Sequence, residues 1–292
     1  MSAPQRTGFD TLPATRFPGY EVVPRGAQAG LLIVHGIAEH ADRYRHVAAA
    51  LGNNGIACFA YDQQGHGLFP GTRTHVQDFA DFAKDLESVG KALRERFPAL
   101  PLFVWGHSMG SVVVTLAAID GLSWANGVIT SGAALHATPK LDGIGGAVAR
   151  IAASVAPRVR ISLRIDGTKL SRVEEIQRQH MSDPLVPRTA SLRLLYGFAL
   201  ACRQCNANLA RITHPWLAVH GEADAVCPPS GSKALIGGLG STDKQLVTYP
   251  QLLHEVHNED DRSRAILFEL MTRWMLERSH GPQIPQAPLP GA

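Results

Sequence analysis

The 292-residue sequence lacks the features of several common classes of protein. Its four cysteines, Cys58, Cys202, Cys205 and Cys227, are too few and too scattered for a disulfide-stabilised scaffold. No stretch reaches the roughly 18 consecutive apolar residues that a membrane-spanning helix needs. The first residues also carry no apolar run of the kind found in a signal peptide. We therefore expect a cytoplasmic, globular protein.

Metal-binding motifs are also missing. Cys202 and Cys205 have C-x-x-C spacing, but no second pair and no histidine partner follow at the spacing of a zinc site. The histidine–glycine stretches at 35–40 and 62–67 contain neither an H-x-x-x-H pair nor paired carboxylates. We expect no metal and no other cofactor, loop-structuring roles for these two stretches, and two cysteines that pack within a helix.

The charge of the chain is small but unevenly distributed. A net charge of +3, with 18% charged residues, is too low for a nucleic-acid-binding protein, so we expect no nucleic-acid partner. One segment is more basic than the rest. It contains Lys140, Arg150, Arg158, Arg160, Arg164, Lys169 and Arg172 against Asp142 and Asp166.

The sequence LFVWGHSMGS at 102–111 is the most informative stretch of the chain. An apolar run of strand length leads to Ser108, with Gly106 and Gly110 two residues to either side, and a helix-forming run follows. Glycine is needed at both positions because a nucleophile elbow bends so sharply that side chains there would collide with neighbouring elements. Ser108 would then lie at a helix N-terminus, where backbone N–H groups can meet a developing oxyanion. The pattern predicts a nucleophilic serine.

Strand-like and helix-like stretches alternate along most of the chain. Short connections between them predict a doubly wound, mostly parallel α/β sheet, in which the strand C-termini share one edge. The predicted strands are 31–34, 56–61, 102–105, 127–131, 215–220 and 245–249. The predicted helices are 43–53, 76–96, 112–120, 147–155, 188–209 and 260–277.

The alternation stops at residues 135–210, which we call the cap segment. An insertion of this size between two strands predicts a cap over the strand edge, although helices that only pack would give the same pattern. The expected α/β core is then 20–134 together with 211–279. Residues 1–19 and 280–292 are terminal arms, the first of them an arm or a first sheet edge and the second proline-rich and disordered.

A serine nucleophile needs a base that is held by an acid, in the chain order serine, acid, histidine for hydrolases of this type. Asp224 follows the first strand after the cap segment, at the same edge as Ser108. Glu222 is too close to the strand end, and Asp243 precedes a strand and is expected at the opposite edge. Asp224 is therefore the predicted acid.

The base and the oxyanion loop are predicted in the same way. His254 follows the last strand directly, whereas its neighbour His257 would already enter the final helix. The turn at 35–36 follows a buried strand, where such hydrolases place an oxyanion-hole donor, and the backbone N–H of Ile37 is the expected donor.

Further stretches match one family in order along the chain. The sequence resembles the monoacylglycerol lipase branch of the α/β-hydrolases, also described as serine aminopeptidase-like or lysophospholipase-like hydrolases. The resemblance covers residues from about 30 to 260. The matching stretches are HGIAEH at 35–40 with Arg43 and Tyr44, Asp62 with GHG at 65–67, GHSMG at 106–110, SDPL at 182–185, HGEAD at 220–224 with Cys227, and HEVH at 254–257.

The resemblance implies an α/β-hydrolase fold and a triad of Ser108, Asp224 and His254. It places the oxyanion hole on the backbone N–H groups of Ile37 and Met109.

The resemblance also extends to residues around the triad. It places Glu39, Arg43 and His257 in a polar cluster near the exit for glycerol, as substrate-binding residues, and it matches Cys227 to a cysteine beside the acid. Ser111 departs from the family, because many members have glycine there, and 140–170 matches least.

These observations predict a serine hydrolase that cleaves carboxylic esters through an acyl-enzyme, with a small lipid or ester as its substrate. Monoacylglycerol or lysophospholipid is the expected substrate class. A short-chain carboxylesterase, a peptidase and a non-catalytic binding protein on the same fold are the alternatives. The basic, apolar cap segment suggests peripheral contact with membranes, although a solvated basic face is the simpler explanation of the charges. The sequence does not determine the oligomeric state.

Overall fold

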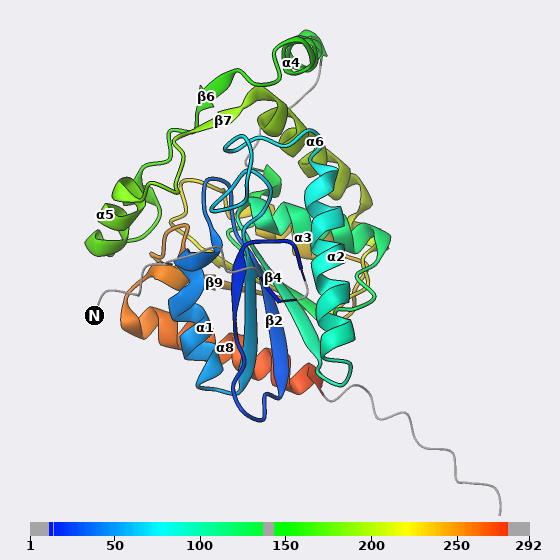
Figure 1. The fold of residues 1–292 in the computed structure, drawn as a ribbon, viewed down its shortest axis with the longest axis vertical. Helices are drawn as coiled ribbons and strands as arrows, with labels where there is room; N and C mark the ends of the chain where they lie inside the picture. Colours follow the sequence, from blue (N-terminus) through cyan, green and yellow to red (C-terminus); the bar gives the residue numbers. More distant parts are fainter. Residues whose placement is uncertain (1–11, 14, 137–142, 280–292) are drawn as a thin grey trace, which may run out of the picture.

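The computed structural model describes residues 12, 13, 15–136 and 143–279, and this part of the chain forms a seven-stranded sheet with helices on both faces (Figure 1). The strand order is β1-β3-β2-β4-β5-β8-β9, with β1 antiparallel to β3 and the other neighbouring pairs parallel. The predicted doubly wound, mostly parallel sheet is therefore confirmed. Its strands are β1 (Gly19–Val22), β2 (Ala29–Val34), β3 (Ile56–Tyr61), β4 (Leu102–His107), β5 (Gly127–Ser131), β8 (Trp216–Gly221) and β9 (Lys244–Tyr249).

The central strands are buried on both faces, as their continuous apolar sequences predict. Side chains alternate between the faces, so in β4 Val104 packs in one hydrophobic core while Phe103 and Trp105 pack in the other. The first core includes residues of α2 (Ala80–Arg96) and α3 (Met109–Asp120). The second includes residues of α1 (Arg45–Gly52) and α8 (Asp261–Ser279).

Several predicted helix limits were wrong. The helix predicted at 76–96 begins only at Ala80, where the Asp78 carboxylate accepts a hydrogen bond from the Ala80 N–H. The helix predicted at 43–53 is divided into a 3₁₀ turn at Ala41–Tyr44 and α1. Strand β1 extends the core sheet by one antiparallel edge strand, which pairs with β3.

The cap segment lies between β5 and β8 in the chain and contains α4 (Gly143–Val155), α5 (Glu174–Ser182) and α6 (Leu192–Asn208). The helix predicted at 188–209 was wrong at its start, because Thr189–Ser191 form strand β7, paired antiparallel with β6 (Arg160–Ser162). Helix α6 starts after Ser191, whose hydroxyl accepts a hydrogen bond from the Leu194 N–H. Figure 1 shows α4, β6 and β7 beyond one end of the sheet.

The sequence did not predict α5 or α7 (Ser230–Gly238). Helix α5 is mostly charged and polar, and α7 is rich in glycine and serine, so neither carries the apolar periodicity from which helices are predicted. None of the described helices is both long and apolar enough to cross a lipid bilayer. The disorder predicted for 282–292 lies outside the described residues.

Candidate active site

Ser108 occupies a strained turn between β4 and α3. Its φ of 52° and ψ of −120° lie in a region that residues other than glycine rarely adopt. A Cβ atom at Gly106 would lie 2.4 Å from the carbonyl oxygen of Gly110, and one at Gly110 would lie 2.2 Å from that of Val34. The close approach of strand and helix therefore explains both glycines of the motif, and it presents Ser108 at the strand end.

The structure brings Asp224 and His254 together. His254 Nδ1 lies 2.7 Å from Asp224 Oδ2, and Asp224 Oδ1 accepts hydrogen bonds from the Val226 and Cys227 N–H groups at 2.8 Å each. Asp224 Oδ2 also contacts His220 Nε2 at 3.1 Å. The carboxylate thus has its hydrogen-bonding capacity filled and holds the imidazole by one nitrogen.

The pKa values of the two side chains shift in opposite directions. Burial alone would raise the pKa of Asp224, but hydrogen bonds from His220 and His254 hold it well below its ordinary value. Burial alone would lower the pKa of His254, but its hydrogen bond to Asp224 and the nearby negative charges raise it above 6.5. The pair is therefore arranged to stabilise a protonated imidazole.

Ser108 and His254 line the same small cavity. Among the described residues, the hydroxyl of Ser108 makes no hydrogen bond to His254, and Ser108 and Cys227 line the same larger cavity. Burial and the charge of Asp224 raise the pKa of Cys227 well above 9, so this thiol is neutral at physiological pH. Catalytic hydrogen bonds are often long or absent before substrate binds.

The oxyanion-loop residues lie beside Ser108. A Cβ atom at Gly36 would lie 3.0 Å from that of Ser108, which places the loop against the serine. Met109 is the first residue of α3, so its N–H has no acceptor within the helix. In the described part of the chain, the Ile37 N–H also has no acceptor. Both N–H groups are therefore available to an oxyanion.

A second cavity, of about 400 Å³, opens beside Ser108. Core residues line one part of it and side chains of the cap segment the other, and the core residues are Ile37, Ser108, Met109, Ala134, Val226 and Cys227. The residues from the cap segment are Ala149, Leu163, Ile165, Leu192, Leu195, Tyr196, Phe198 and Ala199. The serine therefore faces an apolar space that the cap segment shapes.

The competing candidates lie elsewhere. Glu222 accepts a hydrogen bond from the Thr248 hydroxyl and does not contact His254. Asp243 pairs with Arg278 of α8 at the N-terminal end of β9. The Asp62 carboxylate accepts hydrogen bonds from two backbone N–H groups of its surrounding loops, which is a structural role.

His257, the rival base, is buried in a 3₁₀ turn (Val256–Asn258) and not in the final helix as predicted. Its ring stacks on Tyr44 at 4.9 Å, and neither of its nitrogens has a hydrogen-bond partner among the described residues. Burial lowers the pKa of His257 to about 3. His257 is thus a neutral ring packed behind the site.

Glu39 and Arg43 lie next to Glu255, a residue to which the sequence assigned no role. Arg43 Nη2 is 2.7 Å from both carboxylate oxygens of Glu255, and Arg43 Nε is 3.4 Å from Glu39 Oε1. Glu39 and Glu255 line the cavity that contains Ser108. The only sequence signal for Glu255 was its position directly after His254.

Comparisons with known proteins identify the family of the chain. The family model of the serine aminopeptidases, S33, matches residues 25–261. The chain is 32% identical to a monoacylglycerol lipase of Mycolicibacterium smegmatis over 87% of this chain and 89% of the relative, and 30% identical to the human monoglyceride lipase over 88% and 85%. A solved structure of a Saccharomyces cerevisiae monoglyceride lipase with a substrate analogue superposes with a TM-score of 0.80, at 26% identity, over 95% of this chain and 96% of that chain.

Proposed function

The chain belongs to the serine aminopeptidase S33 family of α/β-hydrolases, and from that premise we propose that it hydrolyses monoacylglycerol-type carboxylic esters through Ser108, His254 and Asp224. The observation that carries the proposal is the buried 2.7 Å contact between Asp224 and His254, which line up behind a serine held in a strained elbow.

In the proposed reaction, Ser108 Oγ attacks the ester carbonyl carbon as His254 Nε2 takes its proton. The backbone N–H groups of Ile37 and Met109 stabilise the negative charge that develops on the carbonyl oxygen. The tetrahedral intermediate collapses, and the alcohol leaves with the proton from His254. Water then attacks the acyl-enzyme by the same route and releases the acid.

The two cavities differ in size and in lining. The apolar cavity of about 400 Å³ suits an acyl chain, since its lining offers hardly any polar group beyond Ser108. The smaller cavity beside the triad is lined by Glu39 and Glu255 and has a volume of only about 20 Å³, which is room for about one water. Of the predicted substrate-binding residues, Glu39 lines this small cavity, while Arg43 and His257 are not among its lining residues.

A panel of substrates tests the proposal. We expect wild-type protein to hydrolyse medium-chain monoacylglycerols and p-nitrophenyl esters, and Ser108→Ala to lose activity by at least about 10⁴-fold while its thermal unfolding is unchanged. Retained activity in Ser108→Ala would refute the triad. Preferential cleavage of aminoacyl amides would favour a peptidase instead, and preference for acetyl esters a short-chain carboxylesterase.

We also propose that the cap segment rests on lipid surfaces. Helix α4 exposes Ile144, Val148, Ile151 and Val155 at helical spacing, and Ile144 and Val155 are 84% and 81% exposed. Arg150 lies on the same helix and Arg158 shortly after it. An exposed apolar stripe beside basic residues is typical of a helix that lies at a membrane interface.

Liposome co-sedimentation tests this surface. We expect wild-type protein to bind vesicles that contain anionic lipid, and the double variant Ile144→Ser, Val155→Ser to bind less. Ile266→Ser is the matched control, because Ile266 is an exposed apolar residue of α8, outside the cap segment. Binding that depends on neither the anionic lipid nor the α4 side chains would refute contact through the cap.

A further inference from the structure

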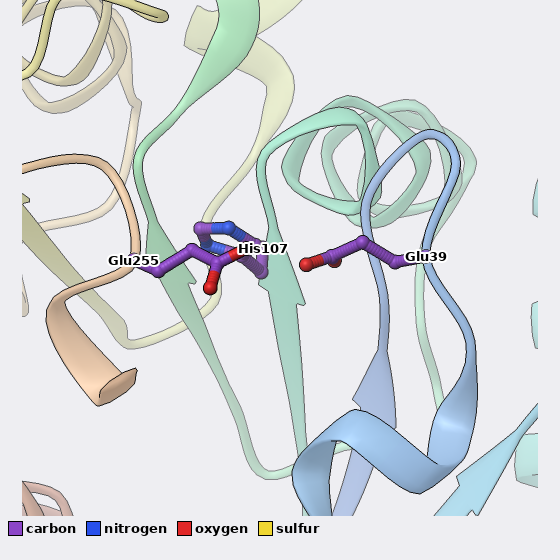
Figure 2. A group of neighbouring side chains, drawn as sticks. All are labelled: Glu39, His107 and Glu255. Carbon is purple, nitrogen blue, oxygen red and sulfur yellow. The ribbon is translucent and has the colours of Figure 1, made fainter. Parts of the chain in front are cut away.

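Behind His254 and the oxyanion loop lies a buried group of two carboxyls and one guanidinium, Glu39, Arg43 and Glu255, which we call the carboxyl cluster. The side chains of these residues are 6%, 8% and 2% exposed. Figure 2 shows Glu39 and Glu255 pointing toward each other beside His107. One carboxylate oxygen of Glu39, one of Glu255 and one ring nitrogen of His107 lie within 4.8 Å of one another.

The charges of the cluster do not balance if both carboxyls are ionised. Arg43 supplies one positive charge, and burial lowers the pKa of His107 well below 6.5, so that ring is neutral. A net negative charge in such a site is costly. Burial and the charge of Glu255 raise the pKa of Glu39 to about 7, whereas Arg43 overcomes burial and keeps the pKa of Glu255 low.

The cluster is connected to both halves of the catalytic machinery. Glu39 Oε2 accepts a hydrogen bond from the Gly36 N–H at 2.7 Å, directly before the oxyanion donor Ile37. Glu255 follows His254 in the chain, and its own N–H donates to the Leu170 carbonyl of the cap segment at 2.7 Å. Arg43 joins the two carboxyls. The oxyanion loop and the base loop are thus held together through three side chains.

We propose that Glu39 and Glu255 share one proton across Arg43, and that this pair positions the oxyanion loop against His254 and strengthens the base when the proton leaves. The inference rests on the proposed function, because it assigns the pair a role in ester hydrolysis. Both are positioning residues, since they act through His254 and Ile37.

The other ionisable groups that face Glu39 and Glu255 do not supply the proton that these two residues share. Tyr44 donates its hydroxyl to Glu39 Oε2 at 2.8 Å, and its pKa is raised well above 10, so it stays neutral. His180 of α5 reaches the small cavity from the cap segment, and burial lowers its pKa. The remaining neighbours are His254 and the neutral rings of His107 and His257.

The two carboxamide variants give a sharp test. Glu39→Gln and Glu255→Gln each replace one carboxyl by an isosteric amide, whose NH₂ group takes the place of the shared proton. Each variant therefore leaves one carboxylate beside Arg43, so that the cluster stays neutral across the neutral pH range, as in the protonated wild type.

We expect the pH profile of kcat/KM to change in the same way in both variants. Wild type should show a second ionisation near neutral pH beside that of His254. Both variants should lose it, and their acid limb should move to lower pH by about one unit because a negative charge near His254 is gone. The activity of both at high pH should fall about threefold, since the base is weaker.

Asp243→Asn is the matched control, because Asp243 also holds an arginine by two hydrogen bonds, far from the site. We expect its pH profile to equal that of wild type. A uniform loss of activity in Glu39→Gln and Glu255→Gln with an unchanged profile would show a purely structural role and overturn the proposal. So would different profiles in the two variants, or a shifted profile in the control.

Infrared titration of wild-type protein carrying labelled glutamate tests the shared proton without any variant. The carbonyl stretch of a protonated carboxyl should disappear as pH rises through neutrality, and its absence at pH 6 would overturn the proposal. A stoichiometric divalent metal that a chelator removes together with activity would also overturn it, since Arg43 could not then bridge the pair. If wild type cleaves no ester, the proposed function fails, while the infrared result still shows whether Glu39 and Glu255 share a proton.

Discussion

The C-terminal edge of the sheet and the cap segment are built in opposite ways. At the edge, the central strands are fully buried. A Cβ atom placed on Gly106 or Gly110 would lie within 2.4 Å of a neighbouring backbone oxygen. In the cap segment, β6 is exposed along its length, and a Cβ atom at Gly145 of α4 would meet nothing within 4 Å. Larger side chains at these glycines of the edge would therefore clash, whereas this part of the cap segment has room for them. We infer that the edge determines the reaction and the cap segment determines which substrate reaches it.

The largest expected effect is the loss of activity on replacing Asp224, the proposed acid of the triad. Asp224→Asn should lower kcat by about 10⁴-fold, because the amide favours the wrong tautomer of His254. Glu222→Gln, two residues away, should leave kcat unchanged, since the Glu222 carboxylate accepts a hydrogen bond from the Thr248 hydroxyl and, among the described residues, makes none to His254. Steady-state hydrolysis of p-nitrophenyl butyrate measures both. Equal losses in the two variants would contradict the assignment of the acid.

One Gly→Ala substitution in each region compares their packing. Gly110→Ala should destabilise the fold by about 3 kcal/mol or more, because the new Cβ atom would lie 2.2 Å from the Val34 carbonyl oxygen. Gly145→Ala should stabilise the protein by up to about 1 kcal/mol, since alanine favours a helix and meets no neighbour there. Chemical denaturation measures both. A tolerated Gly110→Ala would show that the elbow is less tightly packed than the structure indicates.

A smaller effect concerns the pH dependence of activity. His254 must be neutral to take the proton of Ser108, and its pKa is raised above 6.5 chiefly by Asp224. The value of kcat/KM should therefore fall about tenfold per unit as pH decreases below that pKa. Rates of ester hydrolysis from pH 5 to 9 check this, and an acid limb centred below 6.5 would show that Asp224 does not act on the base as proposed.

The sheet could be predicted from the sequence because its signals are local. Continuous apolar runs such as 31–34 mark strands that are covered on both faces, and the loops that follow them gather at one edge. That rule alone placed Ser108, Asp224 and His254 at the same edge, and the structure brings Asp224 within 2.7 Å of His254.

What the sequence could not predict depends on distant contacts or weak local patterns. Arg43 and Glu255 are 212 residues apart, so no periodicity reveals their ion pair. Strand β7 was read as the first turn of a helix, because its three residues form a strand only through pairing with β6. The polar helix α5 has few apolar residues, and it packs against the 3₁₀ turn Gly167–Lys169 of the cap segment.

The dependence of ester hydrolysis on the length of the acyl chain tests most directly whether the edge determines the reaction and the cap segment determines the substrate. Ala149 of α4 lines the cavity of about 400 Å³ beside Ser108, whereas Val155 of the same helix is 81% exposed. We expect Ala149→Phe to lower kcat/KM for a dodecanoyl ester by about tenfold or more while changing the acetyl ester by less than about twofold, and Val155→Phe to change neither. If Ala149→Phe lowered the rates for all chain lengths by one common factor, the cap segment would take part in the reaction itself, and the account would be wrong.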